Sequence, residues 1–281
     1  MNIIGHSKQK KYFNHVITDD RLGHAYLFSG PEMIGKRVFA FEVAKSLLGG
    51  GDISQNPDFK LIAPKVEDGE SKIYIEDIRD LKKFVSLKTY SGGRRVIVLD
   101  NVHCLTPEAA NAFLKVLEEP PVGSLVILIS AMPDLITPTI LSRCEEVRFI
   151  GANEKEISGF LESRKLKKED ADFLIKIAGG RIGLMERIIV SDGIAEARKA
   201  VADLRNLLSS GIYEKIDYAK KVHEKGDYQP RIDYWLNWVS AHVAVSPKNE
   251  KIVKELLSLS TLISQPQFNH RLALENFLLN L

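Results

Sequence analysis

The stretch from Val96 to Cys144 constrains this chain more strongly than any other part of it. It contains two short apolar runs, Val96–Leu99 and Leu125–Ile129, which are rich in β-branched residues and flanked by residues that break regular structure. Such runs are typical of strands that are buried on both faces of a parallel sheet. The sequence therefore predicts an α/β fold whose sheet is covered by helices on both sides.

One amphipathic helix is predicted between these two strands. Thr106 is a candidate N-cap, Pro107 suits the first turn, and Pro120-Pro121 forms a stop. Apolar residues recur every fourth position along this segment and would form one stripe against the sheet: Leu105, Ala109, Phe113 and Leu117. Further along the chain, Ser142-Arg143-Cys144 presents a guanidinium near a helix end.

A second motif lies near the N-terminus. A strand candidate at 24–29 leads into Gly30-Pro31-Glu32-Met33-Ile34-Gly35-Lys36-Arg37, and an apolar helix follows from Val38 to Leu48. This order of strand, glycine-rich loop and helix predicts a phosphate cradle. Gly30 and Gly35 would let backbone amides face inward, and Lys36 would reach the terminal phosphates. A glycine-rich turn without a ligand is the alternative.

Two residues depart from what ATP hydrolysis requires. The position after the loop lysine is normally Ser or Thr, whose hydroxyl binds Mg²⁺, but here it is Arg37, which offers no oxygen and adds a positive charge. After the strand at 96–99, ATPases of this type carry two acids, one for the water shell of the metal and one to polarise the attacking water. Asp100 supplies the first, whereas Asn101 cannot act as a base. We therefore expect a phosphate-loop fold that has lost productive Mg-ATP chemistry.

The remaining segments predict structure rather than chemistry. Residues 63–71 are expected to be a polar loop, and the chain from about Ile194 onward is expected to contain helices only. Trp235 and Trp238 lie three residues apart on one helical face and favour a core or helix–helix interface over a nucleic-acid platform. His103 is expected to be a packed or capping residue.

Composition excludes several classes of protein. A net charge of +2 over 281 residues is an exception, since it argues neither for nor against nucleic-acid binding. Cys104 and Cys144 have no metal-ligand spacing and are expected to be reduced, buried thiols, which fits a reducing cytoplasm. The N-terminal residues lack the apolar core of a signal peptide, and no apolar run is long enough to span a membrane, so we expect a soluble cytoplasmic protein.

Two motifs carry a resemblance to a known family. The first is Asn-Ala-Phe-Leu-Lys-Val-Leu-Glu-Glu-Pro-Pro at 111–121, and the second is Leu-Ser-Arg-Cys at 141–144. With them, residues 1–190 resemble the AAA+ subunits of the sliding-clamp loader of bacterial DNA polymerase III, and among these most of all the delta-prime type. The resemblance implies an α/β P-loop AAA+ core at 1–150, a small helical lid at 151–192, and an all-helical C-terminal collar domain for oligomerisation at 193–281.

The resemblance also implies a function. Clamp-loader subunits of this kind form an open hetero-pentamer with ATP bound at the subunit boundaries. In such a ring Arg143, assisted by Ser142, would be an arginine finger that acts in trans on ATP held by the neighbouring subunit. The chain's own nucleotide site, made of Gly30, Gly35, Lys36, Arg37 and Asp100, would be degenerate and could be vacant. Within the lid, Ile182 lies where active subunits carry a sensor arginine.

The partners implied by the resemblance are gamma/tau-type ATPase and delta-type subunits, and, through the assembly, the sliding clamp and primed DNA. No zinc is expected, because the region of the family's four-cysteine insertion is here the short segment 49–56. Three alternatives stay open: an ATP-hydrolysing gamma/tau-type motor of the same loader, an unrelated P-loop enzyme such as a small-molecule kinase, and, for Arg143, a plain ion pair with Glu145 or Glu146.

Overall fold

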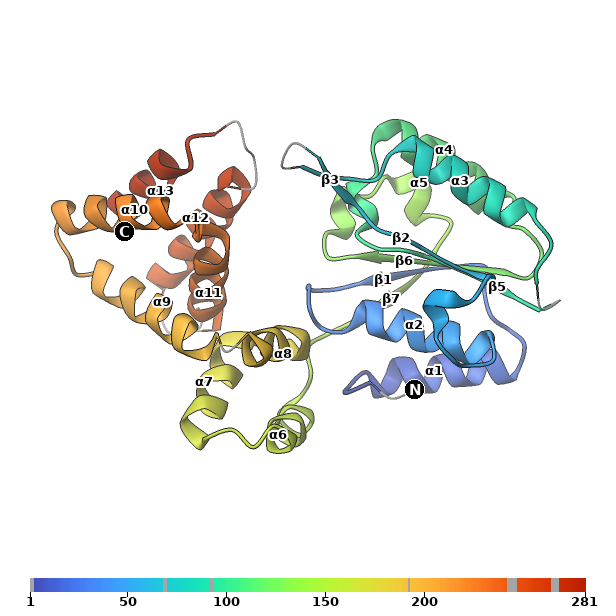
Figure 1. Ribbon diagram of the computed structural model, residues 1–281, viewed down its shortest axis with the longest axis horizontal. Coiled ribbons are helices and arrows are strands. Elements are labelled where there is room, and N and C mark those ends of the chain that lie inside the picture. Colours follow the sequence, from blue (N-terminus) through green and yellow to red (C-terminus); the bar gives the residue numbers. More distant parts are fainter. Residues whose placement is uncertain (1–2, 68–69, 91–92, 192, 242–246, 264–267) are drawn as a thin grey trace. The chain divides into compact units, whose positions relative to one another are not determined.

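The computed structural model describes residues 3–67, 70–90, 93–191, 193–241, 247–263 and 268–281. These residues form two compact units (Figure 1). The first is built from residues up to Glu67 and from Ser71 to Glu156, and the second mainly from Ile157 to Leu281. The first unit has an α/β architecture, whereas the described part of the second contains helices.

A sheet of five parallel strands, in the order β2-β5-β6-β1-β7, forms the centre of the first unit. The strands are β1 (Ala25–Ser29), β2 (Phe59–Ile62), β5 (Arg95–Leu99), β6 (Ser124–Ser130) and β7 (Glu145–Arg148). The two apolar runs Val96–Leu99 and Leu125–Ile129 lie in β5 and β6, which are neighbours with Val96 opposite Leu125. Both strands are buried along their whole length, so the predicted parallel sheet is confirmed.

Helices cover both faces of this sheet (Figure 1). One face packs against α1 (Ser7–Thr18) and α2 (Lys36–Leu47), and the other against α3 (Ile75–Ser86), α4 (Pro107–Glu118) and α5 (Pro138–Leu141). Successive strand residues point to opposite faces, so β1, β2, β5 and β6 each contribute to two hydrophobic cores, whereas β7 contributes to one.

The predicted helix between β5 and β6 is α4. Thr106 is its N-cap and accepts a hydrogen bond at Oγ1 from the amide of Ala109 at 3.2 Å, and Pro107 is its first residue. Ala109, Phe113 and Leu117 of the predicted stripe are buried in the core beneath it. The local signals of this helix are therefore confirmed, including its end before the two prolines.

The prediction of a polar loop at 63–71 is wrong. Lys65–Glu67 (β3) and Glu70–Lys72 (β4) pair as a two-stranded sheet. Both strands consist mainly of charged residues, so no hydrophobic alternation reveals them. Backbone hydrogen bonds hold such a pair, and these leave no mark on residue type.

Helices make up the described part of the second unit. The helix α6 (Glu154–Ser163) begins in the first unit, and the others are α7 (Lys168–Ala178), α8 (Ile182–Val190), α9 (Ile194–Leu207), α10 (Ile212–Lys225), α11 (Tyr228–Ala241), α12 (Pro247–Ile263) and α13 (His270–Leu279). Trp235 is fully buried in their core and donates from Nε1 to the carbonyl of Ala200 at 2.6 Å. The expected core role of this tryptophan is confirmed, while the predicted boundaries at 150 and 192 stay predictions.

Candidate functional site

The predicted phosphate loop connects β1 to α2 and depends on its two glycines. Gly30 has φ +136°, and a Cβ there would lie 2.3 Å from the carbonyl oxygen of Phe149, so only glycine fits. Gly35 has φ +104° and caps the N-terminus of α2. The sequence pattern thus predicted a real strand–loop–helix turn at the carboxyl end of β1, where α/β sheets usually bind their ligands.

Lys36 is buried and its ammonium group is directed back onto this loop. Its Nζ donates to the carbonyl of Gly30 at 2.5 Å and to that of Pro31 at 2.6 Å. Burial lowers the pKa of Lys36 to about 8, against the opposing effect of the Glu32 and Asp100 carboxylates. In this arrangement the lysine satisfies the loop's own carbonyls, and it would have to exchange these bonds to reach a phosphate.

Arg37 and Asp100 form an ion pair where an ATPase would hold its metal. Arg37 Nη1 lies 3.4 Å from Asp100 Oδ2, and its guanidinium lies over the ring of Phe41 with 5.5 Å to the centroid. Asp100 follows β5 directly, so the sheet topology brings it to the same edge as the loop. We call this end of the sheet, with Gly30–Arg37 and Asp100, the loop edge.

The groups at the loop edge do not fit Mg²⁺. This cation requires oxygen ligands in near-octahedral geometry and is commonly held by a carboxylate together with the phosphates. Here the nearby carboxylate has a guanidinium as its partner, and the residue after Lys36 has no oxygen in its side chain. Within the described ranges, no group of three or more His, Cys, Asp or Glu side chains is placed to hold a metal ion.

Asn101 and His103 lie beside Asp100. Asn101 adopts the left-handed conformation with φ 50° and leads into a 3₁₀ turn, Val102–Cys104. His103 Nδ1 lies 3.0 Å from the hydroxyl oxygen of Ser130 at the end of β6, and burial lowers the pKa of this histidine. A neutral histidine held by a hydroxyl is the packed residue that the sequence predicted.

Arg143 lies at the opposite end of the sheet. It precedes β7, whose first residue, Glu145, pairs with Tyr26 of β1, whereas the phosphate loop follows the last residue of β1. Gly30 follows Tyr26 by four positions, which is about 13 Å at ~3.3 Å per residue. Parallel pairing therefore separates Arg143 from the chain's own phosphate loop. We call this end, with Arg143 and its contacts, the Arg143 edge.

The guanidinium of Arg143 is bound by three acceptors and is about one-third exposed, at 36%. Nη1 donates to the carbonyl of Thr139 at 2.9 Å and to Ser142 Oγ at 3.3 Å, and Nη2 donates to Glu118 Oε1 at 2.8 Å. Ser142 Oγ in turn donates to the Thr139 carbonyl at 3.1 Å. Ser142 thus contacts both the arginine and the carbonyl that the arginine binds.

The alternative that Arg143 pairs with Glu145 or Glu146 is wrong, because both carboxylates have other partners. Glu145 accepts a hydrogen bond from Tyr12 at 2.6 Å, and Glu146 accepts one from Ser29 at 2.5 Å. Arg143 pairs instead with Glu118, at the end of α4. Sequence reasoning missed this partner, although both residues belong to the motifs that it singled out.

The two cysteines are half-buried free thiols that pack against the core on the α3–α4 face. Burial raises the pKa of both, and that of Cys144 to about 12. Both side chains are therefore neutral packing groups at neutral pH. The expected burial of the two thiols is met only in part, since both remain partly accessible.

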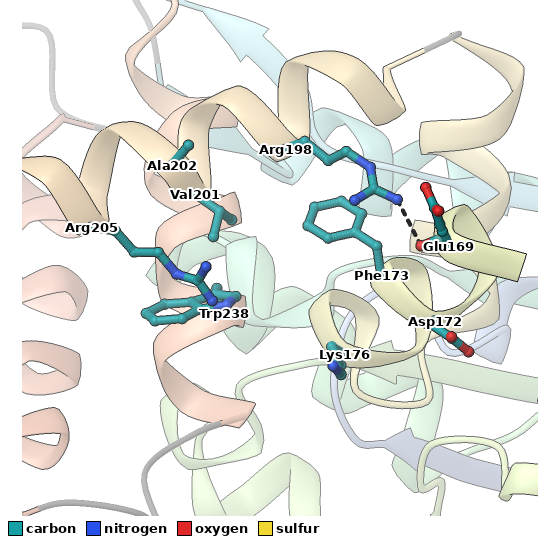
Figure 2. A pocket seen from close by; sticks show the side chains of 9 residues that line it. All are labelled: Glu169, Asp172, Phe173, Lys176, Arg198, Val201, Ala202, Arg205 and Trp238. Atoms are coloured by element: carbon teal, nitrogen blue, oxygen red, sulfur yellow. Dashed lines mark hydrogen bonds between the residues drawn. The ribbon is translucent and has the colours of Figure 1, made fainter.

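A pocket of about 390 Å³ in the second unit is lined by α7, α9 and α11 (Figure 2). Arg198 lies over Phe173, 4.7 Å from its centroid, and donates to the carbonyl of Glu169 at 2.6 Å. Arg205 lies in the same way over Trp238, at 4.8 Å. No site residue predicted from the sequence lines this pocket, and its two arginine–aromatic pairs tie neighbouring helices together.

Comparisons with known proteins agree with the fold and the motifs. The chain is 37% identical over 137 residues to the DNA polymerase III subunit delta' of Pseudomonas aeruginosa, a match over 43% of this chain and 41% of that protein. It is 30% identical over 213 residues to the delta' subunit of Bacillus subtilis, covering 70% of this chain and 63% of that one. The tau/gamma subunit of Haemophilus influenzae is 31% identical over 234 residues, which are 73% of this chain and 34% of that protein. The chain thus spans less than two thirds of each of these relatives.

A solved structure of a DNA polymerase III gamma subunit-related protein from Thermotoga maritima matches over 96% of this chain and 97% of that one, with a TM-score of 0.58 and 20% identity. A RuvB variant from the same organism matches over 72% of this chain and 66% of that one, with a TM-score of 0.51 and 14% identity. At these identities the likeness concerns the fold alone, and the predicted AAA+ architecture with additional C-terminal helices is confirmed. Along the described helices, none combines the length and apolar character needed to cross a bilayer.

Delta' and gamma/tau subunits both match, so similarity by itself does not separate the two types. A family profile described as "DNA polymerase III, delta subunit" matches residues 5–153, which is more than half of the chain. The chain therefore belongs to the DNA polymerase III delta subunit family.

Proposed function

We propose that this chain is a delta-prime-type subunit of the sliding-clamp loader in bacterial DNA replication, one that does not hydrolyse ATP itself. In this proposal Arg143 acts as an arginine finger on ATP bound by the neighbouring gamma/tau-type ATPase subunit. The C-terminal helices contribute to the ring that holds the subunits together. The delta-type subunit, the sliding clamp and primed DNA are further partners through the assembly, and the protein works in the cytoplasm.

One observation carries the proposal: the sheet separates Arg143 from the chain's own phosphate loop. A guanidinium at the amino end of β7 cannot serve a nucleotide at the carboxyl end of β1 in the same chain. It is partly exposed and held in a defined direction, which suits contact with a phosphate on another polypeptide. A planar, permanently charged fork stabilises the charge that spreads over the phosphoryl oxygens in the transition state.

The loop edge supports the other half of the proposal. Arg37 neutralises Asp100, and Asn101 replaces the acid that would polarise the attacking water. Both changes remove groups that hydrolysis needs, and they lie on different elements of the fold. The ATP-hydrolysing gamma/tau-type motor is the second candidate, favoured by the match of the chain to gamma/tau subunits over most of its length.

The experiment has two arms. First, the purified chain is assayed for ATP hydrolysis with Mg²⁺: we expect no turnover above background, and a clear turnover would favour the motor. Second, a loader reconstituted from this chain and its partner subunits is assayed with Arg143→Ala. A trans finger contributes on the order of 10³-fold at its own site. The assembly should lose less, because other boundaries keep their fingers.

Arg148→Ala is the matched control, because Arg148 is an exposed arginine of β7 at the other end of the strand. We expect this variant to keep full ATPase activity and clamp loading. An Arg143→Ala loader that hydrolyses ATP and loads clamps like the wild type would contradict the role in trans.

A further inference from the structure

Glu118 joins the two motifs that mark this chain. It is the last residue of α4, and its Oε1 accepts from Arg143 Nη2 at 2.8 Å across 25 positions of sequence. The adjacent Glu119 is also exposed and carries the same charge at the same helix end. Of the two, Glu118 is the one that meets the guanidinium.

The contacts of Arg143 divide into two groups. Nη1 is bound within its own turn, by the carbonyl of Thr139 and the hydroxyl of Ser142, whereas Nη2 is bound by Glu118 from a different element. The guanidinium is planar and rigid, so fixing both terminal nitrogens fixes the plane of the group. Without Glu118, Nη2 loses this acceptor, and the guanidinium is held through Nη1 alone.

The backbone beneath Arg143 is held independently of Glu118. The amide of Arg143 donates to the carbonyl of Ile140 at 3.1 Å, and the next residue, Cys144, packs against the core on the α4 face. Replacing Glu118 should therefore leave the turn in place. What changes is the direction of the arginine side chain.

Helix stability does not explain why a glutamate occupies position 118. A carboxylate on the last residue of a helix lies at the negative end of the helix dipole, where a cation is preferred. The pair with Arg143 offsets this, but an exposed ion pair contributes little net stability. The ion pair is better explained as a contact by which Glu118 orients Arg143.

We infer that Glu118 is a positioning residue for Arg143, an inference that rests on the function proposed above. It holds the guanidinium in one rotamer at the Arg143 edge before the neighbouring subunit arrives. A group that is already oriented pays a smaller reorganisation cost at the moment of reaction. Because the pair is exposed and weak, phosphate oxygens can compete for the guanidinium.

The test uses the reconstituted loader and separates kcat from KM for ATP. For Glu118→Ala we expect kcat at this boundary to fall on the order of tenfold with KM unchanged, as for a misplaced catalytic group. Glu118→Gln should stay within about twofold of the wild type, because its amide oxygen still accepts from Nη2. Glu119→Ala is the matched control and should have no effect.

A double-mutant cycle shows whether Glu118 acts through Arg143. In an Arg143→Ala loader, adding Glu118→Ala should change nothing further. An equal additional loss there would overturn the inference, as would a silent or activating Glu118→Ala in the otherwise wild-type loader. If Arg143→Ala itself has no effect, the proposed function fails instead, so the two failures are distinguishable.

Discussion

The two ends of one sheet differ in how deeply they bury their charged groups. At the loop edge, Lys36 is buried and bonds to loop carbonyls, and the largely buried carboxylate of Asp100 is paired with Arg37, whose own side chain is half exposed. At the Arg143 edge, the side chains of Arg143 and of its partner Glu118 are both partly exposed to solvent. The loop edge holds its lysine and its carboxylate in largely buried contacts, whereas both partners of the ion pair at the Arg143 edge are accessible to solvent.

This difference shows how a phosphate-loop fold can keep one half of a shared active site. The loop edge would need both its lysine and its carboxylate released before it could bind Mg-ATP. The Arg143 edge needs only the exchange of one weak ion pair. The three predictions that follow test whether the loop edge is structural and closed, from the largest expected effect to the smallest.

Gly30→Ala should destabilise the first unit by about 3–5 kcal/mol, since it combines a left-handed strain with a clash against backbone. The added Cβ would lie 2.3 Å from the Phe149 carbonyl oxygen at φ +136°. Gly49→Ala is the control: it also has positive φ, at +82°, but has open space around it, so we expect about 1–2 kcal/mol. Urea unfolding measures both, and equal losses would show that the loop is not tightly built.

Lys36 should make stability depend on pH. Burial lowers its pKa to about 8 from the ordinary 10.5, so in this window the unfolded chain binds the proton more readily than the folded one. The contribution of Lys36 to the free energy of unfolding should therefore rise between about pH 8 and pH 10.5, by at most about 3 kcal/mol.

The measurement compares urea unfolding of the wild type and Lys36→Met at pH 7.5 and pH 10.5. The free energy of unfolding of the wild type minus that of Lys36→Met should be larger at pH 10.5 than at pH 7.5. Lys45→Met, at a partly exposed position on the same helix, reports the pH dependence common to all variants. A wild-type minus Lys36→Met difference that stays flat would mean that the ammonium is not buried as described.

Arg37→Ser should partly reopen the loop edge, because it supplies the missing hydroxyl and releases Asp100. We expect Mg²⁺-dependent ATP binding to tighten about tenfold, which is ~1.4 kcal/mol. Calorimetric titration with and without Mg²⁺ measures this, and Arg37→Ala separates release of the carboxylate from gain of the hydroxyl. If wild type already binds Mg-ATP as well as Arg37→Ser does, the loop edge is not closed.

The sequence predicted those parts of the fold that local chemistry encodes. The apolar runs of β5 and β6 and the capped helix between them follow from residue type and spacing, and so do the phosphate loop and its departures at Arg37 and Asn101. Strand β3 was missed, since its charged residues carry no hydrophobic pattern.

The pairing of charges was beyond the sequence. Arg143 meets Glu118 rather than its near neighbours, because α4 ends at the edge of the sheet from which β7 begins. Such a contact depends on how distant segments are brought together. The same holds for the ion pair between Arg37 and Asp100, which joins the start of one helix to the end of a strand.

A role of Arg143 in trans is tested by single-turnover ATP hydrolysis by a loader reconstituted with wild-type chain or with Arg143→Ala. If Arg143 serves one phosphate on a neighbouring subunit, the fast phase should lose the amplitude of one ATP per complex while the rate of the remaining fast phase is unchanged. A fast phase with unaltered amplitude and rate in the Arg143→Ala loader would contradict the claim that this chain completes the active site of its neighbour.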